Sequence, residues 1–118
     1  MNPPPHSGLV RLADARTALP GPGGGHAARI FRGGTLDVWL AMTPAVSPTP
    51  MSSHEQDEVY VVIRGRGVLI HHGKPDAFEA GDLMFVGRGI EHRFEDCSDD
   101  LEVWVVFYGI QPNSDQKA

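Results

Sequence analysis

The sequence predicts a single all-β domain, a barrel or sandwich made of many short strands. After residue 28, seven short runs alternate in side-chain character with period two, as β-strands do. Segments rich in Gly, Pro and Asp separate these runs at intervals of roughly ten residues and favour turns. No stretch after Arg29 keeps the 3.6-residue period of an amphipathic helix. A chain of 118 residues is long enough to bury one core without disulfides.

The first 28 residues are predicted to form a loosely attached arm. They contain NPPP and PGPGGGH, which are too rich in Pro and Gly for regular structure. Between these segments only LVRLAD, residues 9–14, suggests a short strand. We therefore predict an N-terminal arm at 1–28, the barrel at 29–110 and a flexible C-terminal tail at 111–118.

The predicted strands are rich in Val, Ile, Leu and aromatic residues, which favour sheets. In order they are ARIF at 28–31, TLDVWLAM at 35–42, EVYVVI at 58–63, GVLIHH at 67–72, DLMFV at 82–86, HRFED at 92–96 and LEVWVVFYG at 101–109. The segments between them, HGKPD and EAGD among them, are predicted turns. So many strands in a small domain protect their edges by closing on one another.

The last predicted strand is apolar on both faces. Leu101, Val103, Val105 and Phe107 point one way, and Glu102, Trp104, Val106 and Tyr108 point the other. We expect the core to cover one face and either a partner subunit or the N-terminal arm to cover the other. This pattern predicts a homodimer.

Net charge, apolar runs and cysteine content indicate which partners and which cellular compartment to expect. The net charge of -5 gives no basic surface for nucleic acid or for an anionic membrane. No apolar run approaches the roughly 20 residues of a membrane span, and the start MNPPPHSG lacks the order of a secretory signal. The single Cys97, in an acidic setting, is predicted to be chemically idle. We expect a cytoplasmic protein.

The stretch SSHEQDEVY, residues 52–60, holds the first candidate site residues. His54, Glu58 and Tyr60 share one face if the chain is extended. On a straight strand His54 and Glu58 would lie about 13 Å apart, so a shared metal requires a bend between them. Tyr60 follows Glu58 on that face and is a candidate to line a cavity. Glu58 and Tyr60 are therefore the catalytic candidates.

The stretch GDLMFVGRGIEHRFED, residues 81–96, holds the second candidate. A tight turn there can bring His92 back across the barrel toward the first stretch. His71 and His72 are predicted to lie at a solvated hairpin tip, because adjacent strand residues point to opposite faces.

Together these two stretches resemble the paired motifs of the cupin superfamily. His54 matches the second histidine of the first motif, Glu58 its glutamate and Gly65 its closing glycine. Gly81, Gly89 and His92 match the second motif. The resemblance implies a double-stranded β-helix, or jelly roll. It also implies a metal site made of His54, Glu58 and His92.

Four positions depart from that family pattern. Ser52 stands at the first histidine, Val46 at the leading glycine, Gly87 at the proline and Asp96 at the asparagine. Two histidines and one carboxylate remain, a set that suits Fe(II) and also Zn, Mn or Ni. Because a serine hydroxyl is a weak ligand, we expect weakened metal affinity.

Two functions lead at this stage, and a purely structural subunit is a third. The first is a metal-dependent cupin enzyme, a dioxygenase, isomerase, decarboxylase or lyase, acting on a small chelating ligand held in the barrel. The second is a non-catalytic module that binds or senses a small molecule through a degenerate metal site.

Overall fold

The structure is a computed structural model that describes residues 7–43 and 55–109. Its helical segments are α1 (Leu12–Arg16) and the short 3-10 helix η1 (Pro22–Gly24). Its strands are β1 (Ala27–Gly33), β2 (Leu36–Met42), β3 (Asp57–Arg64), β4 (Arg66–His71), β5 (Lys74–Glu79), β6 (Leu83–Val86), β7 (His92–Glu95) and β8 (Glu102–Tyr108).

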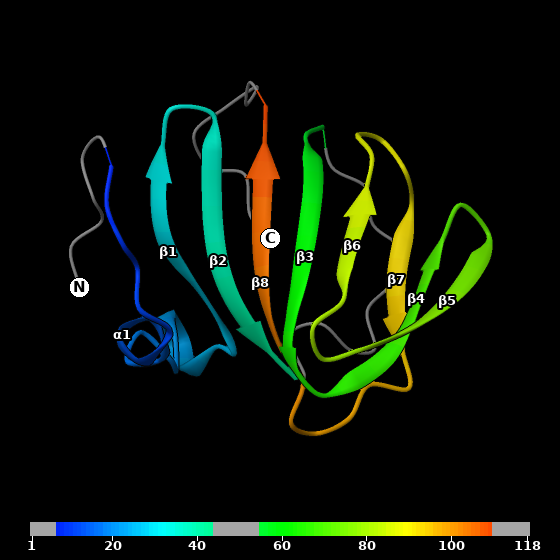
Figure 1. Cartoon of the computed structure of the whole chain (residues 1–118), viewed down its shortest axis with the longest axis horizontal. Coiled ribbons are helices and arrows are strands. Elements are labelled where there is room, and N and C mark those ends of the chain that lie inside the picture. The colour runs from blue at the N-terminus through cyan, green and yellow to red at the C-terminus, as the bar shows by residue number, and fades with distance from the viewer. Residues whose placement is uncertain (1–6, 44–54, 110–118) are drawn as a thin grey trace.

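The strands form two antiparallel sheets (Figure 1). One sheet has five strands in the order β1-β2-β8-β3-β6, and the other has three in the order β5-β4-β7. Side chains from the facing surfaces of both sheets meet in one core, which includes Val62, Leu69, Phe94 and Phe107. The predicted all-β barrel is therefore confirmed, and this two-sheet arrangement is the double-stranded β-helix.

All seven predicted strands are present, and the structure adds one more, β5. Its sequence KPDAFE was assigned to turns because Pro75 and Asp76 disfavour strands. β5 pairs only with β4 and lies at the edge of its sheet, which is where a proline costs little.

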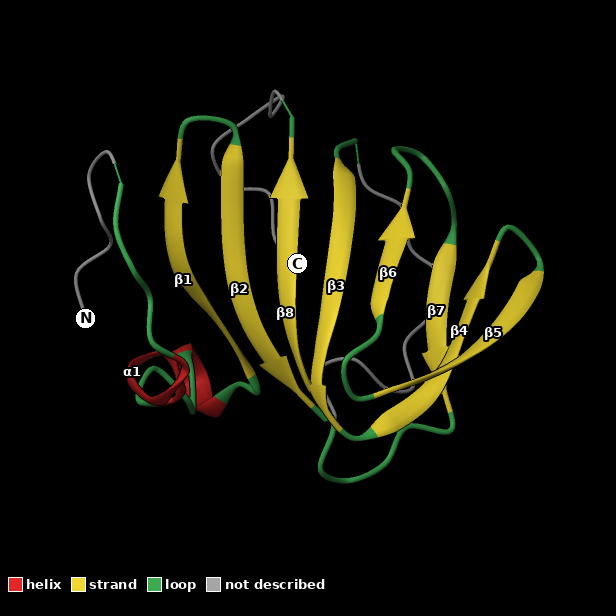
Figure 2. Ribbon diagram, in the orientation of Figure 1, coloured by secondary structure: helices red, strands yellow, loops and turns green. Residues whose placement is uncertain are grey.

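The N-terminal segment differs from its prediction. Instead of a strand at 9–14, the chain forms the helix α1, which lies beside the lower end of β1 (Figure 2). Ala15 is fully buried and packs in a second cluster with Ile30 and Leu40, on the outer face of the five-stranded sheet. Its neighbour Arg16 bonds to Glu102 of β8 through both carboxylate oxygens, at 2.7 and 2.8 Å. The described part of this arm therefore packs against the five-stranded sheet.

The last strand is covered as its pattern predicted. Leu101, Val103, Val105 and Phe107 are buried in the core. On the other face, Glu102 is buried beneath Arg16, and Trp104 packs in the helix cluster. Tyr108, at the far end of that face, stays exposed. The predicted boundaries at 28/29 and 110/111 remain predictions.

Candidate functional site

Three polar side chains meet in the barrel interior. Glu58 and Tyr60 lie two residues apart on β3, so the strand alternation points both of them inward. His92 begins β7 in the opposite sheet. All three side chains are almost completely buried. The cluster therefore bridges the two sheets at residues that the sequence singled out.

The distances within the cluster are short. The Tyr60 hydroxyl donates to Glu58 Oε2 at 2.5 Å and lies 3.1 Å from His92 Nε2. His92 Nε2 is 3.3 Å from Glu58 Oε1. The other ring nitrogen of His92, Nδ1, lies 3.1 Å from the carbonyl oxygen of Ile90, which fixes the ring orientation.

Burial and the Glu58 carboxylate shift the pKa values of both neighbours. Burial raises the pKa of Tyr60 well above its usual range, and the charge and hydrogen bond of Glu58 raise it further. Burial favours neutral His92, but its hydrogen bonds to Glu58 and to the Ile90 carbonyl outweigh burial and raise its pKa. The carboxylate thus favours the protonated forms of both partners.

The third predicted ligand, His54, lies outside the described residues, as do Val46 and Ser52. Among residues 7–43 and 55–109, no three His, Cys, Asp or Glu side chains gather where they could hold a metal. Glu58 and His92 do fit one. Adjacent ligands bound at ~2.1 Å to a single ion lie about 3 Å apart, and Oε1 and Nε2 are separated by 3.3 Å.

Gln56, just before β3, is a further buried polar side chain that sequence reasoning did not single out. Its place in the segment EQD predicts turn hydrogen bonds or a side chain that faces solvent, and its Nε2 does donate to the Gly109 carbonyl at 3.0 Å. The side chain is nevertheless buried, and its Oε1 has no hydrogen-bond partner among the described residues. The alternation of 56, 58 and 60 on one face was the available signal.

A pocket of about 350 Å³ opens between β5 and β6, the facing edges of the two sheets. Buried Leu69, Phe78 and Met84, which belong to the same core as Tyr60, form its inner wall. His71 and Asp76 line its rim, with His71 Nε2 2.6 Å from Asp76 Oδ2. Glu58, Tyr60 and His92 do not line this pocket, whose buried wall belongs to the same core as Tyr60.

Other predicted residues have structural partners. Arg93, which follows His92 in the sequence, pairs with Glu95 at 2.6 Å. Asp57 accepts a hydrogen bond from the Arg88 backbone N–H. His72 lies in the β4–β5 turn with a positive φ of 50°, as predicted for the hairpin tip.

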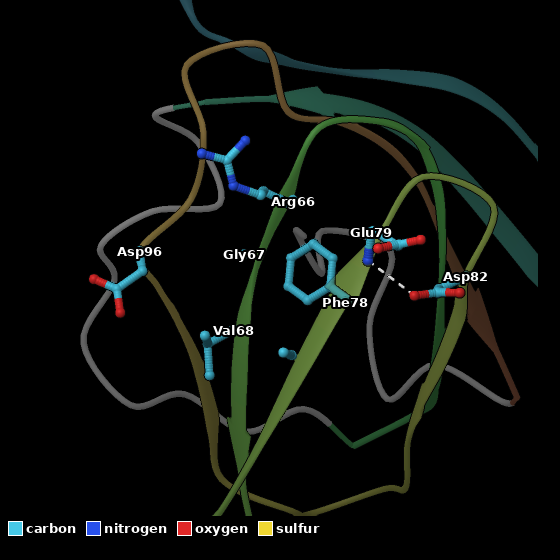
Figure 3. A pocket seen from close by; sticks show the side chains of 8 residues that line it. Arg66, Gly67, Val68, Phe78, Glu79, Asp82 and Asp96 are labelled. Carbon is cyan, nitrogen blue, oxygen red and sulfur yellow. Dashed lines mark hydrogen bonds between the residues drawn. The ribbon is translucent and has the colours of Figure 1, made fainter.

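A second pocket, of about 430 Å³, lies at the three-stranded sheet (Figure 3). Its lining comes from β4, β5 and the segments that follow β5 and β7, with Arg66, Glu79, Asp82 and Asp96 as its charged residues. Asp82 accepts a hydrogen bond from the Glu79 backbone N–H, the dashed line in Figure 3. Glu58, Tyr60 and His92 do not line this pocket, so it is separate from the interior cluster.

The sequence model of the cupin domain matches residues 38–108. This match spans β2 to β8 and includes Glu58, Tyr60 and His92. The chain belongs to the cupin family. An uncharacterized protein of Streptomyces coelicolor is 32% identical to this cupin over 79 residues, 67% of this chain and 75% of the relative.

Solved cupin structures share the fold. A cupin-2 domain protein of Shewanella frigidimarina has a TM-score of 0.68 at 14% identity, over 86% of this chain and 95% of that one. A predicted oxalate decarboxylase of Thermotoga maritima has a TM-score of 0.51 at 27% identity, over 64% of this chain and 65% of that one. Within the described residues, no helix is long and apolar enough to cross a membrane.

Proposed function

We propose that this cupin binds a divalent transition metal, Fe, Mn, Ni or Zn, at the interior cluster and holds a small organic ligand beside it. One observation carries the proposal: a buried carboxylate and a buried imidazole from opposite sheets lie 3.3 Å apart. Glu58 and His92 are two of the ligands, and His54 remains the predicted third. Imidazole and carboxylate are the donors that these ions accept together.

The surroundings of the cluster suit chemistry on a chelating substrate. The bound ion supplies Lewis-acid polarisation of substrate oxygens. We propose that a small molecule enters through the pocket between β5 and β6, whose apolar wall of Leu69, Phe78 and Met84 belongs to the same core as Tyr60. Tyr60 and Glu58, the expected catalytic residues, are the groups that we propose to donate or accept a proton at a substrate oxygen. Dioxygenase, isomerase, decarboxylase and lyase reactions are the classes we propose, and the similarity to a predicted oxalate decarboxylase is in keeping with them.

Metal binding is tested with a histidine pair that the structure supplies. His92 and His71 are register partners on β7 and β4, but only His92 contacts Glu58. We expect the wild-type protein to bind about one equivalent of Fe(II), Mn(II), Ni(II) or Zn(II) and to melt at a higher temperature with that ion. His71→Gln should behave in the same way. His92→Gln should neither bind the ion nor gain melting temperature. Wild-type protein that binds well below one equivalent of all four ions, with no rise in melting temperature, would falsify the proposal.

A second candidate function is a non-catalytic module that binds a small molecule without metal. The Tyr60 hydroxyl favours it, because it contacts both Glu58 and His92 and ties them together by hydrogen bonds alone. Protein stripped with a chelator separates the two functions. A small-molecule ligand that binds the stripped protein as tightly as the metal-loaded one supports the module and not the metalloprotein.

We also propose that the chain forms a homodimer through the outer face of the five-stranded sheet. Leu83 and Phe85 on β6 are 65% and 60% exposed, and Tyr108 on β8 is 56% exposed. The half-buried Val59, Val61 and Val106 lie in register between them. Together these side chains expose roughly 400–600 Å² of apolar surface, about the apolar share of a standard interface of ~800 Å² per partner. A flat apolar sheet face is complementary to a second copy of itself.

A cytoplasmic location, and the absence of nucleic-acid and membrane partners, are further predictions. Their support is the net charge of -5 and the single cysteine.

A further inference from the structure

We propose that Tyr60 is itself a ligand of the metal, beside Glu58 and His92. This inference rests on the proposed metal binding and adds a residue that the family resemblance does not assign. The phenolic oxygen takes the role of the imidazole that is missing where Ser52 stands.

The polar atoms of the three side chains lie 2.5–3.3 Å from one another, with a different carboxylate oxygen of Glu58 facing each partner. The Tyr60 oxygen is 2.5 Å from Glu58 Oε2 and 3.1 Å from His92 Nε2, and Nε2 is 3.3 Å from Glu58 Oε1. Donors on one face of an ion with bonds of about 2.0–2.2 Å lie ~3 Å apart. The contacts of 3.1 and 3.3 Å already match this spacing, and the 2.5 Å contact between Tyr60 and Glu58 must lengthen by about half an ångström once the phenolic proton has left.

The packing around Tyr60 holds its ring in this position. The ring of Phe94 on β7 meets it edge to face, with centroids 5.0 Å apart and an interplanar angle of 80°. Tyr60 pairs in register with Val105 on one side and Met84 on the other, and both are buried. A ring packed in this way keeps its hydroxyl beside Glu58 and His92, within reach of an ion that these two side chains bind.

When the phenolic oxygen binds the metal ion, it exchanges its proton for the ion. The divalent ion enters, the phenolic proton leaves to solvent, and the oxygen bonds to the metal in place of that proton. Phenolate oxygen is a hard donor that suits the same first-row ions as carboxylate.

The test uses the colour of iron bound to phenolate, which does not depend on any activity. Protein loaded with Fe(III) should show a visible charge-transfer band from phenolate to iron, with one iron per chain. The chain has two tyrosines, so Tyr108→Phe, at the exposed position on β8, is the matched control and should keep the band. Tyr60→Phe should lose it, and its metal Kd should rise at least about tenfold, a loss that removing an outer partner of a ligand already causes.

The possible outcomes separate this inference from the proposed function. Wild-type protein that binds iron without the band, or Tyr60→Phe protein that keeps it, overturns Tyr60 as a ligand and leaves metal binding intact. Tighter metal binding by Tyr60→Phe also overturns it, because the hydroxyl would then block the ion. Wild-type protein that binds no ion overturns both. If Tyr60→Phe fails to fold, as judged by circular dichroism, the presence or absence of the band in the wild-type and Tyr108→Phe proteins still decides.

Discussion

Gly65, between β3 and β4, shows how one residue allows the chain to leave the five-stranded sheet and enter the other. Its φ is +90°, a conformation that side chains other than glycine rarely adopt. A Cβ atom there would lie 2.6 Å from the Leu101 Cα and 2.9 Å from the Leu101 backbone nitrogen. Because the obstructing atoms are backbone, they cannot turn aside.

Gly65→Ala should therefore destabilise the fold more than an ordinary glycine change. We expect a loss of about 2–5 kcal/mol in the free energy of unfolding, from the positive φ and the forced contact together. Gly73→Ala is the control, since Gly73 also has a positive φ, +75°, but nothing lies within 4 Å of its Cβ position. It should lose only about 1–2 kcal/mol. Equal losses in urea unfolding would show that the contact with Leu101 is not restrictive.

Single residues also show how far the sequence could predict the site. The spacing of Glu58 and His92 within two recognisable motifs was enough to place both in one interior cluster. The contact of the Tyr60 hydroxyl with both of them depends on how β3 and β7 approach across the barrel, which no local pattern encodes. The buried carboxylate of Asp37, outside the cluster, was missed for a similar reason: Arg29, eight residues earlier on the paired strand β1, bonds to both of its oxygens, and Arg32 lies 3.4 Å from one of them.

Among the secondary-structure elements, the shortest ones were hardest to predict. The five residues of α1 carry too few turns to show a helical period, and the helix is stabilised by tertiary contacts of Ala15 and Arg16. β5 carries a proline and an aspartate, and it becomes a strand because β4 pairs with it over six residues. The long strands β3 and β8, with clear alternation, were predicted correctly within a residue or two.

The ion pair that attaches α1 to β8 predicts a change of stability with pH. The Arg16 hydrogen bonds hold the pKa of buried Glu102 below its usual range. A lowered carboxyl pKa contributes stability that is present above the unfolded-state value, about 4.3, and is lost as pH falls through the folded-state value. Arg16→Gln should therefore melt below the wild type at pH 7, and this difference should shrink steadily once the pH drops below about 4.

Arg11, exposed and one residue before α1, provides the control for charge alone. Arg11→Gln removes the same charge from the same segment, so its melting temperature should follow that of the wild type at every pH. A gap between Arg16→Gln and the wild type that stays constant down to pH 2 would show that the lost contribution is packing and not the ion pair.

At the scale of the whole molecule, the outer face of the five-stranded sheet has two halves that differ. The outer face of the five-stranded sheet carries α1 over β1 and β2, while the neighbouring part over β6, β3 and β8 presents apolar side chains. Exposed apolar patches of this size on soluble proteins usually mark a binding surface. The covered half shows that this face can be buried, and the open half is where we place the second subunit.

A charge at Phe85, on the edge strand β6 of the open half, tests the dimer. Phe85→Glu should convert the wild-type dimer to a monomer at micromolar concentration, because a carboxylate would be buried without a partner in the interface. Leu9→Glu puts the same charge at another exposed apolar position, in the N-terminal segment, and should leave the dimer unchanged. Light scattering coupled to size-exclusion chromatography reads both variants. A monomeric wild type, or a dimeric Phe85→Glu, would rule out this interface.

Leu83 and Phe85, which belong to the proposed dimer face, also line the pocket between β5 and β6. A subunit seated on the outer face would stand at the entrance of that pocket. The dissociation rate of a ligand would then depend on protein concentration, with slow escape from dimers and fast escape from monomers. The rate of subunit exchange would then set the residence time of a ligand in the pocket.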